Sequence, residues 1–193
     1  MYIISSAGGV GTTFFIDWLR HFYTVNDRND VDKLKHPKKP LERKDIKKVV
    51  YIYTKKPEEQ ALSLVKRFKS AQIKKLTGNT LPINSQNDLT KFNYDPFNFE
   101  GVFKNWWKDT EHKYPIAFIN YDVLWSYIPQ IVQFLDLAPD KAKSFPPRRQ
   151  RKNTLDSIKH NTFLTSHLIN IYKDYKEYLS NIPDFYVKEG NKQ

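Results

Sequence analysis

The sequence predicts an α/β fold of three layers, in which helices flank a mainly parallel central sheet. Three short apolar segments have the β-branched and aromatic composition of buried strands: 2–5, 49–53 and 116–120. Each is followed by a segment whose apolar residues recur with helical spacing: 14–22, 57–76 and 126–137. Strands that alternate with helices form parallel sheets with right-handed crossovers. A chain of 193 residues is long enough for one α/β domain and too short for two ordinary ones, so we expect one domain over residues 1–193.

Two more helices and two long loops complete the expected architecture. Helical spacing recurs at 99–112 and over a long amphipathic helix at 153–179. The segments 26–48 and 77–98 are polar with little periodicity, and prolines break any long helix in the first of them. We expect the first loop to be exposed, and long loops of this kind often serve as lids over functional sites.

The composition restricts the classes of partner and chemistry. A formal net charge of +11 favours an anionic partner, such as a phosphorylated nucleotide, an acidic glycan, nucleic acid or a membrane surface. The absence of cysteine excludes disulfides and cysteine nucleophiles, and the spacing of the five histidines matches no zinc motif, so we expect no metal. No apolar run approaches the ~20 residues that span a bilayer. We therefore expect a soluble protein without signal peptide or membrane span, cytoplasmic by default.

A glycine-rich segment joins the first strand to the first helix: Gly8, Gly9, Val10, Gly11, Thr12 and Thr13. Glycines let backbone N–H groups approach an anion, the following helix offers its positive N-terminal end, and the threonines add hydroxyl donors. The end of the first strand of an α/β sheet is also where ligands bind. The segment predicts a P-loop-like phosphate loop, and the alternative is a turn that only packs closely. A Walker A loop has lysine where this chain has Thr12, which disfavours ATP or GTP hydrolysis.

The end of this loop resembles the 5′-phosphosulfate loop of sulfotransferases, commonly Pro-Lys-Ser-Gly-Thr-Thr-Trp. Gly11, Thr12 and Thr13 match that loop, and Phe14 stands where the family has a tryptophan that stacks on adenine. Gly9 stands where the family has the lysine that bridges the sulfate and the leaving phosphate. The resemblance implies that residues 8–14 bind the nucleotide. It also implies that a cation from elsewhere, such as the segment 35–48, neutralises the charge that develops during transfer.

The segment from Val50 to Leu64 is similar to the family's 3′-phosphate segment, typically Tyr-Val-Tyr-Arg-Asn-Pro-Lys-Asp-Val-Ala-Leu-Ser. The spacing of eight residues between the family's arginine and serine falls on Lys55 and Ser63. The resemblance implies that both bind the 3′-phosphate. Lys55 keeps the charge of the arginine but not its bidentate geometry.

Two later segments extend the resemblance. Tyr121 falls where a family tyrosine reaches the adenine, after a buried strand. The basic segment 146–153 occupies the place of the family's Arg-Lys-Gly element, which closes over the 3′-phosphate. The resemblance implies that Arg151 and Lys152 have that role. Taken alone, such a run of cations is typical of a solvated loop or a nucleic-acid surface.

The implied reaction transfers a sulfuryl group from 3′-phosphoadenosine 5′-phosphosulfate to an acceptor hydroxyl or amine, for example on a glycan, and leaves adenosine 3′,5′-bisphosphate. In the family the general base is a His or Glu between the first helix and the second strand, which assigns His36 or Glu42, with His21 also available. Two other functions stay open. One is a non-catalytic module that keeps the nucleotide pocket, and the other, less favoured, is a nucleic-acid-binding protein that uses the basic surface and stacking aromatics.

Overall fold

The computed structural model describes residues 1–67, 73–74, 80–148 and 152–191. The chain divides into two compact units. The first comprises residues 1–54, 103–149 and 183–193, and the second comprises 55–102 and 150–182. All strands of the described residues belong to the first unit. The single domain over the whole chain stays a prediction.

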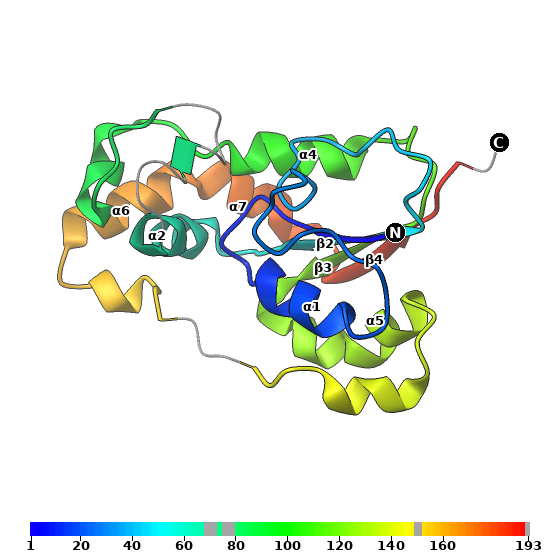
Figure 1. The fold of residues 1–193 in the computed structure, drawn as a ribbon. Helices are drawn as coiled ribbons and strands as arrows, with labels where there is room; N and C mark the ends of the chain where they lie inside the picture. Colours follow the sequence, from blue (N-terminus) through cyan, green and yellow to red (C-terminus); the bar gives the residue numbers. More distant parts are fainter. Residues whose placement is uncertain (68–72, 75–79, 149–151, 192–193) are drawn as a thin grey trace. The chain divides into compact units, whose positions relative to one another are not determined.

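The first unit contains an open four-stranded sheet in the order β1 (Tyr2–Ser5), β2 (Lys48–Tyr53), β3 (Ile116–Asn120) and β4 (Phe185–Lys188). The first three strands are parallel, which confirms the α/β class and the mainly parallel sheet (Figure 1). β4 pairs antiparallel with β3 and was not predicted. The sheet is therefore mixed.

Helices flank both faces of this sheet. Successive strand residues point to opposite faces, and Ile4, Val50 and Ile52 share a buried cluster with residues of α1 (Thr12–Leu19) and α5 (Ile128–Phe134). On the other face Tyr51 packs against Trp106 of α4 (Phe99–Lys108), with ring centroids 4.9 Å apart. Burial on both faces explains why these strands read as continuous apolar runs.

The outer edge of β1 is covered by the segment that follows α1. The backbone N–H of Tyr2 donates to the carbonyl of Thr24 at 3.0 Å, and Tyr2 forms a parallel bridge with Val25. Asn26 continues this pairing with its side chain, which accepts from the N–H of Ile4 at 2.8 Å and donates to its carbonyl at 3.1 Å. The chain therefore passes on one side of β1 before it returns to the other side as β2.

Several helix boundaries of the first unit differ by a few residues from those predicted. α1 ends at Leu19, and α4 ends at Lys108. A 3-10 helix, η2 (Tyr121–Tyr127), precedes α5, and another, η3 (Pro139–Ser144), follows it. Boundaries are the part of a helix that sequence patterns define least well.

The second unit is helical in its described residues. Its elements are α2 (Pro57–Arg67), η1 (Gln86–Lys91), η4 (Asp156–Ile158), α6 (Thr162–Ile171) and α7 (Lys173–Ser180). The predicted continuation of α2 to residue 76 falls largely outside the described residues. A partly buried hydrogen bond from the Tyr172 hydroxyl to Asp95, 3.0 Å long, joins the residue before α7 to the loop before α4.

The single long helix predicted at 153–179 is wrong. Asn161 accepts a hydrogen bond from the N–H of Leu164 and so begins α6, while Tyr172 ends α6 and precedes α7 with a backbone of φ −97° and ψ 6°. An asparagine cap and a non-helical tyrosine therefore divide the amphipathic stretch. In the described parts of the chain, no helix combines the length and the apolar character needed to cross a bilayer.

The first prediction concerns Asn26. Asn26→Ala leaves the buried N–H and carbonyl of Ile4 without partners, and each unpaired group costs about 1–3 kcal/mol. Urea denaturation should show a lower free energy of unfolding. The exposed Asn84→Ala is the matched control and should change it by less than about 0.5 kcal/mol. Equal effects of the two substitutions would contradict the role of Asn26.

Candidate functional site

The glycine loop between β1 and α1 has a backbone that only glycine adopts without cost. Gly8, Gly9 and Gly11 have φ values of 96°, 73° and 74°. Gly11 precedes the first turn of α1, and no side chain of the described residues caps that helix. The loop begins with a hydrogen bond of 2.9 Å from the N–H of Gly8 to the hydroxyl of Ser6. The peptide N–H groups at the start of α1 are thus not taken by a side-chain cap.

Gly9 marks the position where the sulfotransferase loop has its lysine. With φ at 73°, a lysine at this position would cost about 1–2 kcal/mol of backbone strain. The glycine in this place therefore agrees with the conformation of the loop.

A buried lysine from another segment lies against the loop. The Nζ of Lys35 donates to the Thr13 hydroxyl and to the carbonyl of Arg28, both at 2.7 Å. Lys35 is only 8% exposed, and burial lowers the pKa of its ammonium, an effect that nearby Asp30 partly offsets. The backbone joins the same two segments, because the N–H of Ser6 donates to the carbonyl of Lys35 at 3.2 Å. Lys35 is the first residue of the segment from which a cation was expected.

The segment that carries Lys35 is folded by aspartate side chains. Asp27 accepts from the N–H groups of Asn29 and Val31 at 2.7 and 3.2 Å. Asp30 has φ at 60° and accepts from the N–H of Lys35 at 2.9 Å. The pKa of Asp27 is lowered, chiefly by the hydrogen bond from the N–H of Val31 and to a smaller extent by that from Asn29. Local turns of this kind, which aspartate favours, fix the path toward Lys35.

The two predicted general bases differ in their surroundings. The Nδ1 of His36 lies 2.9 Å from the carbonyl of Ser6. Because a carbonyl only accepts, Nδ1 carries the proton, and the neutral ring then has its lone pair on Nε2. Glu42 has a side chain that is 90% exposed and lies 3.5 Å from the ammonium of Lys39. His36 therefore bonds to the start of the glycine loop, whereas the contact of Glu42 is with a surface lysine.

Aromatic rings lie against the last glycine of the loop. A Cβ on Gly11 would collide with the ring of Phe14 and would lie 2.8 Å from the Tyr121 ring. Phe14 stacks on Trp125 at 5.7 Å and meets Phe145 edge-on at 5.9 Å. Phe14 and Tyr121 are both half-buried. Both predicted adenine-contacting residues thus adjoin the glycine loop.

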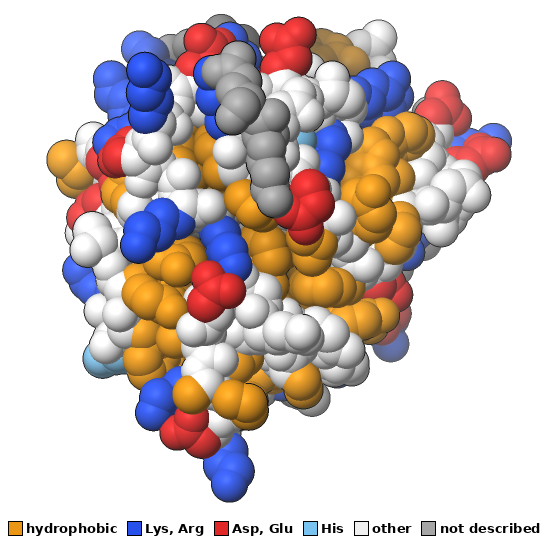
Figure 2. All heavy atoms as spheres, turned by 90° about the vertical axis from the view of Figure 1, so that its right-hand side faces the viewer, with side chains coloured by type: hydrophobic (Ala, Val, Ile, Leu, Met, Phe, Trp, Pro, Cys, Tyr) orange, Lys and Arg blue, Asp and Glu red, His pale blue; other side chains and the backbone are white. Residues whose placement is uncertain are grey.

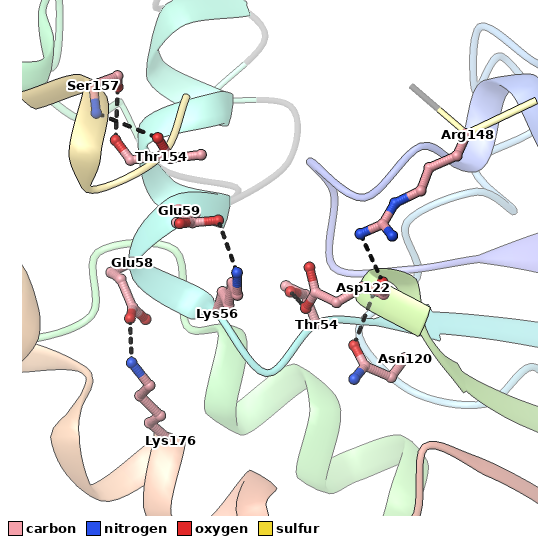
Figure 3. A network of polar contacts seen from close by, with 10 residues as sticks. All are labelled: Thr54, Lys56, Glu58, Glu59, Asn120, Asp122, Arg148, Thr154, Ser157 and Lys176. Carbon is pink, nitrogen blue, oxygen red and sulfur yellow. Dashed lines mark hydrogen bonds and ion pairs between the residues drawn. The ribbon is translucent and has the colours of Figure 1, made fainter. Parts of the chain in front are cut away.

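Polar residues at the carboxyl ends of β2 and β3 form a second group in the first unit (Figure 3). The Thr54 hydroxyl donates to the carboxylate of Asp122 at 2.7 Å, and the N–H of Asp122 donates to Asn120 at 3.1 Å. Arg148 donates to the carbonyl of Asp122 at 3.2 Å. Thr54, Asp122 and Arg148 were not predicted as site residues, although the position of Thr54 and Asp122 just after buried strands was a signal for those two.

The residues assigned to the 3′-phosphate belong to the second unit. Lys55 is half-buried, Ser63 is buried on α2, and Lys152 is exposed, while Arg151 lies outside the described residues. The first turn of α2 adds two buried carboxylates. Glu58 accepts from Lys176 at 2.5 Å, and Glu59 lies 4.0 Å from Lys56 (Figure 3).

The second prediction tests the need for glycine at position 11. Gly11→Ala and Gly11→Asn both introduce a Cβ that displaces Phe14, so both should lower the free energy of unfolding. Asparagine tolerates a left-handed backbone better than alanine, so the alanine variant should lose more, by about 1 kcal/mol. Chemical denaturation measures both changes. A Gly11→Ala protein as stable as the wild type would show that the loop adopts another conformation.

Within the first unit, the structure brings the glycine loop together with Lys35, His36 and Tyr121. In the described ranges, no group of three or more histidine or acidic side chains could hold a metal ion. Comparison with known proteins found no match to the chain among family models, curated proteins or solved structures.

Proposed function

We propose that the chain binds an adenosine nucleotide with its 5′-phosphate or 5′-phosphosulfate group at the glycine loop. The observation that carries this proposal is the loop itself. Three left-handed glycines follow the carboxyl end of β1 and precede a helix that has no side-chain cap among the described residues. Backbone N–H groups in such a loop, together with a helix N-terminus, favour an anion of phosphate size.

The rings next to Gly11 support an adenosine rather than a simple phosphate. Phe14 and Tyr121 adjoin the loop and are only half-buried, so their remaining surface can contact a base. Stacking of a base on an aromatic ring contributes about 1–3 kcal/mol. The same two positions carry the adenine contacts in the sulfotransferases that the loop resembles.

We further propose that the nucleotide is 3′-phosphoadenosine 5′-phosphosulfate and that the chain is a sulfotransferase. The assignment of the 3′-phosphate to Lys55, Ser63, Arg151 and Lys152 rests on the resemblance alone. The acceptor is a hydroxyl or amine, for example on a glycan. The acceptor oxygen or nitrogen forms a bond to sulfur while the bond from sulfur to the 5′-phosphate oxygen breaks, and the leaving adenosine 3′,5′-bisphosphate keeps the electron pair.

The acceptor's proton needs a base, and His36 is better supported than Glu42. The hydrogen bond to Ser6 fixes the tautomer in which Nε2 is basic and ties the ring to the start of the loop. The Glu42 side chain is almost fully exposed. Proton transfer to a positioned base contributes roughly 100- to 10,000-fold to a rate.

The face of the molecule shown in Figure 2 lacks the continuous positive surface expected for nucleic-acid binding. On that face the Lys and Arg side chains are scattered among acidic and hydrophobic side chains rather than gathered into one stripe. Single-stranded nucleic acids are bound along continuous positive grooves with stacking platforms. A nucleotide that contacts one loop needs no such track.

The third prediction is that adenosine 3′,5′-bisphosphate stabilises the fold. At about 100 times its dissociation constant, a ligand bound only by the native state adds about 2.7 kcal/mol. Differential scanning fluorimetry should show a larger shift with this nucleotide than with AMP at equal concentration, because AMP lacks the 3′-phosphate. No shift with any adenosine nucleotide, or an equal shift with a short oligonucleotide, would contradict the proposal.

The fourth prediction concerns the 3′-phosphate. Lys55→Ala removes a charge-assisted contact of roughly 1.5–3 kcal/mol, so calorimetry should show weaker binding of adenosine 3′,5′-bisphosphate and unchanged binding of AMP. Lys66→Ala on the exposed side of α2 changes the net charge equally and serves as the control. Equal losses for both nucleotides would remove Lys55 from the 3′-phosphate.

A further inference from the structure

We propose that Lys35 supplies the cation of the glycine loop and binds the 5′-phosphate or phosphosulfate group together with the Thr13 hydroxyl. This inference rests on the proposed function, because it requires an anion at the loop. The sulfotransferase loop has a lysine at the position of Gly9, and here Lys35, 26 positions later in the sequence, supplies that positive charge.

Lys35 has a buried ammonium that forms no ion pair with a carboxylate of the described residues. Lys35 is 92% buried, and its Nζ bonds to neutral oxygens of Thr13 and Arg28. Among the described residues, no carboxylate forms an ion pair with it. Burial of an unpaired charge is costly unless an opposite charge joins it. A bound phosphate provides that charge.

The ammonium of Lys35 has one hydrogen-bond donor left for a ligand. An ammonium has three N–H bonds, and two of those of Lys35 point to Thr13 and Arg28, which leaves one for a ligand oxygen. The Thr13 hydroxyl accepts from Lys35, so its own proton remains available for donation. Lys35 and Thr13 therefore present two adjacent donors at the start of α1, where the N-terminal end of the helix adds positive potential.

Hydrogen bonds link the segment that carries Lys35 to the start of the glycine loop. The carbonyl of Lys35 accepts from Ser6, and the neighbouring His36 donates to the Ser6 carbonyl. These bonds fix the backbone of Lys35 to the residue from which the glycine loop begins. A lysine at Gly9 would be strained, whereas Lys35 reaches the loop from a segment whose path is set by aspartate turns.

One cation and three carboxylates surround the ammonium of Lys35 without forming an ion pair with it. Arg28 and the carboxylates of Asp17, Asp27 and Asp30 act on the ammonium at longer range. Burial is the largest effect, and it lowers the pKa of Lys35. A bound dianion favours the charged form and raises that pKa again.

The test is calorimetry with AMP and adenosine 3′,5′-bisphosphate on the full chain. Lys35→Met keeps the length and apolar stem of the side chain but removes the ammonium. It should weaken both nucleotides by the same factor, about tenfold or more, because both share the 5′-phosphate. Lys44→Met, an exposed lysine of the same segment, makes the same change in net charge and should have little effect.

A second variant guards against loss of folding in Lys35→Met. Thr13→Val keeps the shape of the side chain and removes the hydroxyl that Lys35 contacts, so it should also weaken both nucleotides equally. If the wild type binds neither nucleotide, the proposed function fails. If the wild type binds them and Lys35→Met, folded by circular dichroism, binds as tightly as Lys44→Met, the nucleotide site stands and the role of Lys35 is overturned. If Lys35→Met does not fold and Thr13→Val binds normally, the role of Lys35 is likewise overturned.

Discussion

The candidate site depends on the hydrogen bonds that Ser6 forms with Lys35 and His36. Ser6 is the first residue after β1, and its N–H and carbonyl are both taken by this distant segment. Its hydroxyl accepts from Gly8 and so shapes the start of the glycine loop. One residue thus joins the end of a strand, the glycine loop and the segment that carries a buried lysine and a histidine.

These bonds follow from the path of the chain around β1. After α1, the segment 24–26 pairs with the outer edge of β1, and Lys35 then accepts a hydrogen bond from Ser6 at the end of the same strand. That pairing fixes the residue from which the aspartate turns begin. These turns then place Lys35 beside Thr13. The site is therefore a product of tertiary pairing as much as of the local glycine sequence.

Features with a local sequence signal could be predicted, whereas features that depend on tertiary pairing could not. β1, β2, β3 and the glycine loop were predictable, because burial on both faces and the glycine pattern are local signals. The contact of Lys35 with Thr13 was not, since it depends on pairing between segments about 20 residues apart, although the run of aspartates before it indicated turns. β4 was missed because it is short and only half-buried, and it becomes a strand through its pairing with β3. The break at Asn161 had a signal in the asparagine itself, a preferred N-cap that the amphipathic pattern concealed.

The side chain of Asn26 also has a consequence for the behaviour of the protein in a crowded solution. The open edge of a sheet offers N–H and carbonyl groups to which strands of other molecules can add, which is one route to aggregation. Asn26 occupies both groups of Ile4 with a single amide, and Thr24 takes the N–H of Tyr2. The side-chain amide of Asn26 forms the hydrogen bonds that another strand would form, but it presents no new strand edge. Very few residues therefore prevent strands of other molecules from adding to β1.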